Sequence, residues 1–144
     1  NPATSTLSNE DWRNAIDEDT PFKVKWEKEQ QVDIITLDQL IEEYGMPDFC
    51  KLDVENYETE ALKGLSYPIP ALSVEFYPAA MTSAIECVEL LEELGNYEFN
   101  WSYGESQVFN ETTWITADAL KSIFKKYTRQ DKYGDFYAKI RPLC

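Results

Sequence analysis

The chain contains no histidine, and this absence excludes whole classes of mechanism. Without an imidazole the chain cannot by itself build a Ser-His-Asp or Cys-His hydrolytic site, or a metal site based on histidine. Its three cysteines, Cys50, Cys87 and Cys144, are widely spaced and form no Cys-x-x-Cys pair. We therefore expect neither a disulfide framework nor a zinc site. Any chemistry must use carboxylates, lysine, tyrosine or backbone groups.

Basic residues and long apolar runs are also scarce. The chain has 13 Lys and Arg against 27 Asp and Glu, a net charge of -14. This charge disfavours binding to nucleic acid, whose phosphates attract Lys and Arg, and to anionic membrane surfaces. No apolar run approaches the roughly 18 residues that cross a bilayer. The first residues lack the basic start and apolar core of a signal peptide. The sequence thus predicts a cytoplasmic protein with no nucleic-acid or membrane partner.

The sequence does contain an alternation of strand and helix patterns, which predicts an α/β fold in a chain of one-domain length. We divide it into a polar segment, 1–31, with a possible edge strand, and an α/β domain, 32–144. The sheet is predicted to be mostly parallel, with its last two strands antiparallel. Strands are expected at Pro21–Glu27, Val32–Ile35, Asp48–Val54, Ala71–Phe76, Tyr97–Tyr103 and Asp135–Arg141.

Four helices are predicted between these strands. The first begins at Thr36, which forms a capping box with Gln39, and it ends at Gly45. Tyr57–Leu65 and Met81–Leu94 show helical apolar spacing, and Thr116 caps a fourth helix. The alternation of aromatic and polar residues in Tyr97–Tyr103 is typical of a half-buried antiparallel strand.

Acidic residues gather where two of the predicted strands end. In Asp48–Val54, period-two geometry places Lys51, Asp53 and Glu55 on one side and Cys50, Leu52 and Val54 on the other. Glu75 lies near the end of the next strand along the chain. Ligands of open parallel sheets bind at the carboxyl ends of strands, so this edge is the predicted site.

Each of these acidic residues also has a purely structural interpretation. A carboxylate inside an apolar strand is costly without a partner, so we expect Asp53 to be paired, ligating or catalytic. Lys51 could be the partner that neutralises Asp53. Glu58 and Glu60, in the first turn of the next helix, could simply complement the helix dipole, and Glu55 could be solvated.

The stretch LDQLIEEYG, followed by PDFCKLDVENYETEALKGL and SVEFYP, resembles the FkbM family of S-adenosylmethionine-dependent methyltransferases. The shared features are a Leu-Asp-x-Leu helix, a strand of the Lys-Ile-Asp-Val-Glu-Gly-x-Glu type and a following Leu-Lys-Gly. The match is close over Ile34–Tyr77 and looser in the tail, GDFYAKIRP. Asn56 stands where the family usually has Gly, and Asn tolerates left-handed backbone better than most residues.

The resemblance implies a doubly wound, Rossmann-like fold whose first strand ends in a Gly-rich cofactor loop. This chain has five glycines, none close to another, and it does not begin with Met. We therefore expect the later half of such a domain, a fragment that is inactive alone although the full-length protein is a methyltransferase. The strand 48–54 would then need the missing N-terminal half or a second chain against its free edge.

The activity that the resemblance implies is methyl transfer from S-adenosylmethionine to a hydroxyl of a sugar or small metabolite. Asp53 is the candidate general base, with Lys51 and Glu75 as further catalytic residues. Asp53, Glu55 and Glu75 could instead hold a divalent cation such as magnesium. The alternative is a non-catalytic acidic binding or assembly module derived from the same fold. In that module the aromatic strand Tyr97–Tyr103 could stack on sugar faces.

Overall fold

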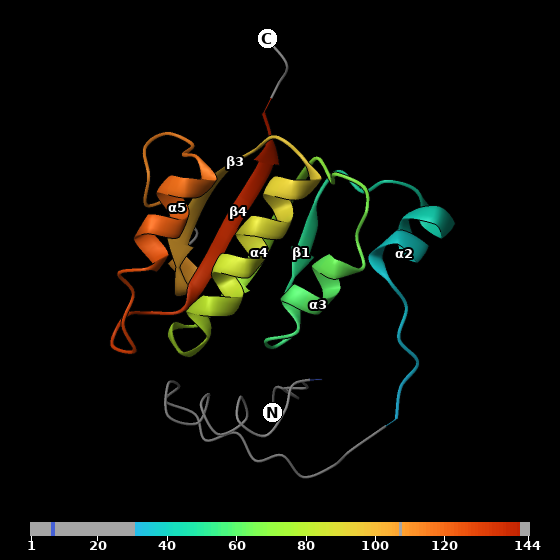
Figure 1. Cartoon of the computed structure of the whole chain (residues 1–144), viewed down its shortest axis with the longest axis horizontal. Helices are drawn as coiled ribbons and strands as arrows, with labels where there is room; N and C mark the ends of the chain where they lie inside the picture. Colours follow the sequence, from blue (N-terminus) through green and yellow to red (C-terminus); the bar gives the residue numbers. More distant parts are fainter. Residues whose placement is uncertain (1–6, 8–30, 107, 142–144) are drawn as a thin grey trace.

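A computed structural model describes Leu7, residues 31–106 and residues 108–141 of the chain. The predicted strand Pro21–Glu27 lies outside these residues, as does almost all of the segment 1–31. The described part has the α/β fold expected from the sequence. Its sheet contains four strands in the order β1-β2-β4-β3 (Figure 1). Their bounds are β1 Cys50–Leu52, β2 Ala71–Phe76, β3 Tyr97–Tyr103 and β4 Gly134–Ile140.

Three helices, α3, α4 and α5, lie side by side across one face of this sheet, and α2 lies beyond α3 (Figure 1). A short 3-10 helix, η1, leads into α4, and a second, η2, follows β3. The helices are α2 Leu37–Tyr44, α3 Glu58–Lys63, η1 Pro78–Ala80, α4 Met81–Leu94, η2 Gly104–Ser106 and α5 Ala117–Phe124.

The sheet is mixed, so the prediction of a mostly parallel sheet is wrong for the described residues. Only β1 and β2 pair in parallel. The last strand, β4, inserts between β2 and β3 and runs antiparallel to both. The predicted antiparallel pairing of the last two strands is therefore confirmed. A pattern of residues along one strand fixes neither its neighbour nor its direction, and β4 lies next to a strand about 60 residues away in sequence.

Local signals fix most element boundaries. Thr36 and Gln39 form the predicted capping box, with the Gln39 N–H donating to Thr36 Oγ1 and the Thr36 N–H donating to Gln39 Oε1. Gly45 ends α2 with a φ of 90°, which favours glycine. Thr116 caps α5 through the Ala119 N–H.

Two predicted strands differ from the structure near the start of the domain. Residues 32–35 form no strand, and Val32, Ile34 and Ile35 are exposed. The strand predicted at Asp48–Val54 is limited to Cys50–Leu52. Because β1 has a neighbour on only one side among the described residues, little backbone pairing is available to extend it.

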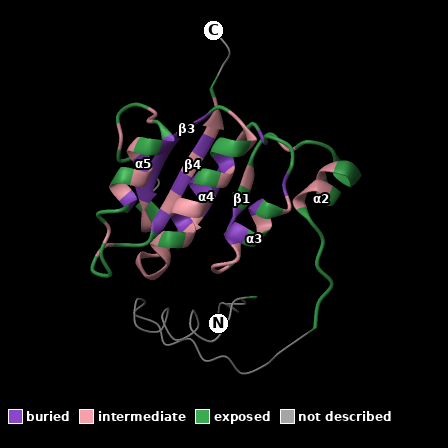
Figure 2. Ribbon diagram, in the orientation of Figure 1, coloured by how far each residue is buried: buried purple, intermediate pink, exposed green. Residues whose placement is uncertain are grey.

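The core lies between the helices and one face of the sheet, visible as buried stripes on the facing sides (Figure 2). Leu72, Val74 and Phe76 alternate along β2 toward this core, so Ser73 and Glu75 lie on the opposite face. The largest fully buried side chains include Phe76, Phe99, Phe124, Phe136, Leu62, Leu91 and Leu120.

β3 is buried on both faces, which corrects the half-buried prediction. Tyr97, Phe99 and Trp101 are buried in the core, so these rings are not available to stack on a sugar. On the other face, Asn100 is buried and its Nδ2 donates to the Glu111 carbonyl at 2.9 Å. The loop that follows β3 thus covers this part of the sheet, a tertiary contact that alternation within β3 does not reveal.

Among the described helices, none is long and apolar enough to cross a membrane.

Candidate active site

The carboxyl ends of β1 and β2 bring three carboxylates together. Asp53 follows β1 directly, Glu55 lies in the next turn, and Glu75 lies on β2. One carboxylate oxygen from each residue lies within 4.8 Å of the others. The two strands run in parallel with Leu52 opposite Val74, so Asp53 and Glu75 lie at the same end of the sheet, where both strands finish. We call Asp53, Glu55 and Glu75 the carboxylate cluster. These are the three residues that the sequence predicts as metal ligands.

A turn in left-handed conformation presents Glu55 to the cluster. Glu55 has a φ of 53° and Asn56 a φ of 68°. Asn is among the few residues other than Gly that adopt this region at low cost, so the turn forms with Asn56 in place of the usual Gly.

Glu58 fixes this turn from within the protein. Its Oε1 accepts hydrogen bonds from the Val54 N–H at 3.1 Å and the Asn56 N–H at 3.2 Å. The residue is only 5% exposed, so the prediction that it merely complements the helix dipole is wrong. Burial raises its pKa, and the backbone hydrogen bonds act against that rise. Glu60 is exposed and forms an ion pair with Lys63 at 2.9 Å, which agrees with a simple surface role.

Asp53 is paired with Lys51, one of the outcomes expected from the sequence. Lys51 Nζ lies 3.1 Å from Asp53 Oδ2, and the Asp53 side chain is 42% exposed. The expectation of a carboxylate enclosed in an apolar strand is therefore wrong, because β1 ends before Asp53 and lies at the edge of the described sheet. The hydrogen bond to Asp53 raises the pKa of Lys51, so this lysine stays protonated. Exposure leaves Asp53 accessible to a ligand.

Glu75 is the most perturbed carboxyl of the cluster. Its pKa is raised to about 8, first by burial and then by a hydrogen bond with Asp53 and repulsion from that carboxylate. A hydrogen bond from Tyr77 acts in the opposite direction. Burial also raises the pKa of Glu55, with repulsion from Asp53 as the next cause. At neutral pH Glu75 is therefore mostly protonated, and the cluster holds a proton that a cation could displace.

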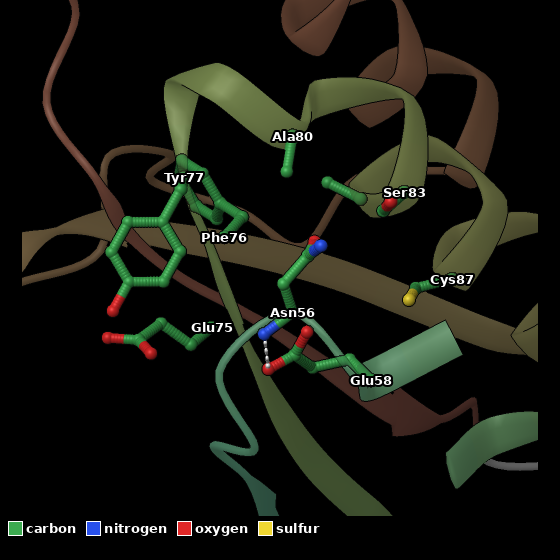
Figure 3. Close-up of a pocket in the computed structure, with 9 residues that line it drawn as sticks. Asn56, Glu58, Glu75, Phe76, Tyr77, Ala80, Ser83 and Cys87 are labelled. Carbon is green, nitrogen blue, oxygen red and sulfur yellow. Dashed lines mark hydrogen bonds between the residues drawn. The ribbon is translucent and has the colours of Figure 1, made fainter. Parts of the chain in front are cut away.

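Two further residues near the carboxylate cluster were not predicted from the sequence. The Tyr77 hydroxyl points toward the Glu75 carboxylate (Figure 3). Burial, followed by the nearby Glu75 and Glu55, raises the pKa of Tyr77, so its hydroxyl remains a hydrogen-bond donor. Asp135 is the register partner of Glu75 across β2 and β4, and burial raises its pKa. Tyr77 lies in the SVEFYP stretch, which was a usable signal, whereas the position of Asp135 depends on a pairing between distant strands.

A small cavity lies beside Glu75, lined by Asn56, Glu58, Tyr77, Ser83 and Cys87 among others (Figure 3). The space open to a water-sized molecule is about 10 Å³, enough for one water at most. This cavity cannot hold S-adenosylmethionine, and the sequence has no Gly-rich loop to bind it. The cavity beside Glu75 is therefore not a cofactor pocket.

The carboxylate cluster does fit a divalent cation. Magnesium binds oxygens at about 2.1 Å in octahedral geometry, so its ligand oxygens lie no more than roughly 4.2 Å apart. The cluster oxygens lie within 4.8 Å of one another, a separation from which side-chain rotation could bring them to such a set of ligands. Carboxylate oxygens are also the ligands that magnesium prefers.

Comparison with protein-family models gives a match over most of the chain. The family model described as the methyltransferase FkbM domain matches residues 3–113. This range contains the capping box, the turn and the whole carboxylate cluster, and it starts well before the region of close resemblance. It does not include β4. No curated protein and no solved structure matches the chain.

Proposed function

The chain belongs to the FkbM methyltransferase family, and we propose from this premise that it forms the acceptor side of an S-adenosylmethionine-dependent O-methyltransferase. The observation that carries the proposal is the convergence of Asp53, Glu55 and Glu75 at the ends of two parallel strands. A hydroxyl is a weak nucleophile until it loses its proton, and these carboxylates provide a base at an accessible edge.

Asp53 is the proposed general base. It is the most exposed member of the cluster, and Lys51 stabilises its charge at 3.1 Å. An acceptor hydroxyl that hydrogen-bonds to Asp53 would give up its proton as the oxygen is methylated. Lys51 would also orient the acceptor or balance the charge that forms on it. General-base catalysis of this kind contributes about 10²–10⁴-fold to the rate.

We further propose that a divalent cation such as magnesium binds to the cluster. The cation would be held by Asp53, Glu55 and Glu75, and it would lower the pKa of an acceptor hydroxyl bound beside it. The raised pKa of Glu75, caused first by burial and then by the hydrogen bond with Asp53 and repulsion from that carboxylate, supports this role, because a bound cation would stabilise the charged form of Glu75 against both effects.

The cofactor side requires structure beyond the described residues. We infer that the four strands are the later half of a doubly wound sheet and that β1 is central in the complete sheet. The parallel pair β1 and β2, acidic at its carboxyl ends, and the closing antiparallel strands support this inference. A sugar or small metabolite with a free hydroxyl is the acceptor class that we propose, in keeping with the small, polar, acidic edge.

A second candidate function is a non-catalytic acidic module. It is favoured by the absence of a Gly-rich loop from the sequence and by the ion pair that neutralises Asp53. In this alternative the cluster binds a basic partner or a cation without chemistry.

Two calorimetric titrations distinguish the functions, the first with the 144-residue chain. Titration with magnesium chloride should give one saturable site in the wild type that is at least tenfold weaker in D53N and E75Q. The matched control is E60Q, which alters an exposed glutamate nearby and should bind as the wild type does. Titration with S-adenosylmethionine is made on the full-length protein that the proposal implies, because the cofactor side lies outside the described residues: binding there supports the methyltransferase, and absence of binding with magnesium binding retained supports the acidic module. A wild type that binds neither ligand would contradict both the cation site and the enzyme.

A further inference from the structure

A row of polar side chains crosses the described sheet at the end where the acceptor is proposed to bind. Asp53 follows β1, Glu75 lies on β2, Asp135 on β4 and Ser102 on β3. Asp135 is the register partner of Glu75 on one side and of Ser102 on the other. The carboxylate cluster occupies one half of this row, and the proposed function gives Asp135 and Ser102 no role.

Asp135 and Ser102 lie on the face of the sheet opposite the helices, as Glu75 does. Their neighbours Phe136 and Trp101 are buried in the core beneath the helices, and side chains alternate between the two faces along a strand. Because the strand order is β1-β2-β4-β3, both residues lie on the side of Glu75 away from β1. Their place in the row therefore does not depend on what pairs with the outer side of β1.

This half of the row has oxygens that lack hydrogen-bond donors among the described residues. Ser102 is 1% exposed, and its Oγ has no hydrogen-bond partner there. Asp135 is partly exposed, and its Oδ1 is buried and also without a partner in the described part of the chain. A buried polar atom without a partner costs roughly 1–3 kcal/mol. A ligand group that brings donors to these two oxygens would remove this cost.

The charge around Asp135 is negative. Asp53 and Glu105 repel the charged form of Asp135, and Lys51 attracts it. Lys51, however, is already paired with Asp53 at 3.1 Å. Asp135 is also outside the group of three carboxylates that could share a metal ion, so the proposed magnesium ion would not bind it directly. This position therefore favours a cationic group of the ligand and disfavours a phosphate or a carboxylate.

We propose that Asp135 and Ser102 bind a protonated amino group of the acceptor, so that the substrate is an amino sugar or another amino alcohol. This inference rests on the proposed function, because it requires that an acceptor hydroxyl reaches Asp53. An ammonium group brings three N–H donors and a positive charge. It matches both the unpartnered oxygens and the negative charge of this half of the row.

The spacing of the row suits a small acceptor. Neighbouring strands are about 4.8 Å apart. Asp53 and Asp135 are two strands apart and still close enough for their charges to repel each other. A single sugar ring can therefore present a hydroxyl to Asp53 and an amino group to Asp135. The methyl transfer itself is unchanged, since the amino group only orients the acceptor.

Titration of the 144-residue chain with three sugars of the same ring tests the proposal. Glucosamine, glucose and glucose-6-phosphate provide a cation, a neutral molecule and an anion, and amide chemical shifts in NMR measure their binding. At about pH 6.5 and about 0.15 M salt the amino group is protonated and long-range charge effects are screened. The wild type should bind glucosamine about tenfold more tightly than glucose. Glucose-6-phosphate should bind more weakly than glucose.

Two variants locate the amino-group site, and a third is the control. Asp135→Asn keeps the shape of the side chain and should bring the affinities for glucosamine and glucose within about twofold of each other. Ser102→Ala removes one acceptor and should weaken glucosamine binding about threefold or more. Asp118→Asn makes the same charge change on α5, at a side chain that is 90% exposed, and should keep the preference. Circular dichroism must show that every variant is folded.

A wild type that binds glucosamine no better than glucose, or binds neither, would overturn the proposal. A preference that persists in folded Asp135→Asn, or glucosamine binding that is unchanged in Ser102→Ala, would also overturn it. Loss of the preference in Asp118→Asn would show non-specific attraction to the net charge and contradict a defined site. None of these outcomes bears on the magnesium titration, and a failed magnesium titration leaves the comparison of sugars readable.

Discussion

At the scale of single residues, Glu58 holds the turn on which the carboxylate cluster depends. It is buried, and one of its oxygens accepts both the Val54 and the Asn56 N–H. The sequence places Glu58 correctly in the first turn of α3, but from there it could equally face the solvent. Its role depends on the turn before the helix, whose N–H groups point at the Glu58 side chain. The apolar spacing of a helix contains no information about that turn.

Truncating this side chain should be costly. In Glu58→Ala two backbone N–H groups lose their acceptor, and we expect the free energy of unfolding to fall by about 2–4 kcal/mol. Urea unfolding of Glu58→Ala and of the exposed control Glu60→Ala measures the effect. The control should lose less than about 1 kcal/mol, because it removes only a surface ion pair. Equal losses in the two variants would contradict the role of Glu58.

Glu75 should make stability depend on pH. Its pKa in the folded protein, about 8, is above the ordinary value of 4.5, so the folded state binds the proton more tightly than the unfolded state. Its contribution to stability is therefore fully present below about pH 4.5 and is lost as the pH rises through about 8.

Glu75→Gln removes this titration and keeps a neutral side chain of the same shape. Between pH 5 and pH 9 the wild type should lose stability relative to the variant, by on the order of a few kcal/mol. Urea unfolding of both proteins at several pH values measures this difference. Parallel stability curves for the two proteins would show that Glu75 titrates normally.

At the scale of elements, β3 and β4 approach each other closely at Gly134. A Cβ atom at this position would lie 2.0 Å from the Ser102 carbonyl oxygen, so the backbones would have to separate. The Cζ atom of Phe76, on β2, would lie 3.1 Å from this added Cβ atom. Gly134 therefore permits the close approach of β3 to β4, the strand that carries Asp135.

Gly134→Ala should lower the free energy of unfolding by about 3 kcal/mol or more, because it displaces backbone that cannot adjust cheaply. Gly95→Ala is the control, since its closest contact is the Cδ1 atom of Ile140 at the flexible end of a side chain. It should cost less than Gly134→Ala. Thermal unfolding of the two variants makes the comparison, and a fully stable Gly134→Ala would show that the strands can separate freely.

The elements themselves could be predicted wherever the signal is local. The capping box at Thr36 and the apolar spacing in Met81–Leu94 each define a helix without tertiary information, and both helices are confirmed. The strand predicted at Val32–Ile35 failed because β-branched residues favour a strand only when a partner strand is present. The order and direction of the strands depend on contacts between distant segments, so the insertion of β4 could not be predicted.

At the scale of the whole molecule, the site arises from two strand ends that the fold brings together. The sequence predicts that Asp53 and Glu75 meet, because two successive buried strands with a helix between them run in parallel. It also offers Lys51 as the partner of Asp53, but it does not predict that Asp53 is exposed while Glu75 is buried, since that difference follows from the position of β1 at the edge of the described sheet. The cluster thus contains one accessible carboxylate and one buried carboxyl that retains its proton at neutral pH.

The most direct test of this account is a pH titration of Glu75 by carbon-13 NMR of its carboxyl group, with Glu60 as the internal reference. We predict that Glu75 titrates near pH 8 and that saturating magnesium moves this titration several units lower, because the cation displaces the proton. A Glu75 carboxyl that titrates near 4.5 and does not respond to magnesium would contradict the coupled carboxylate site.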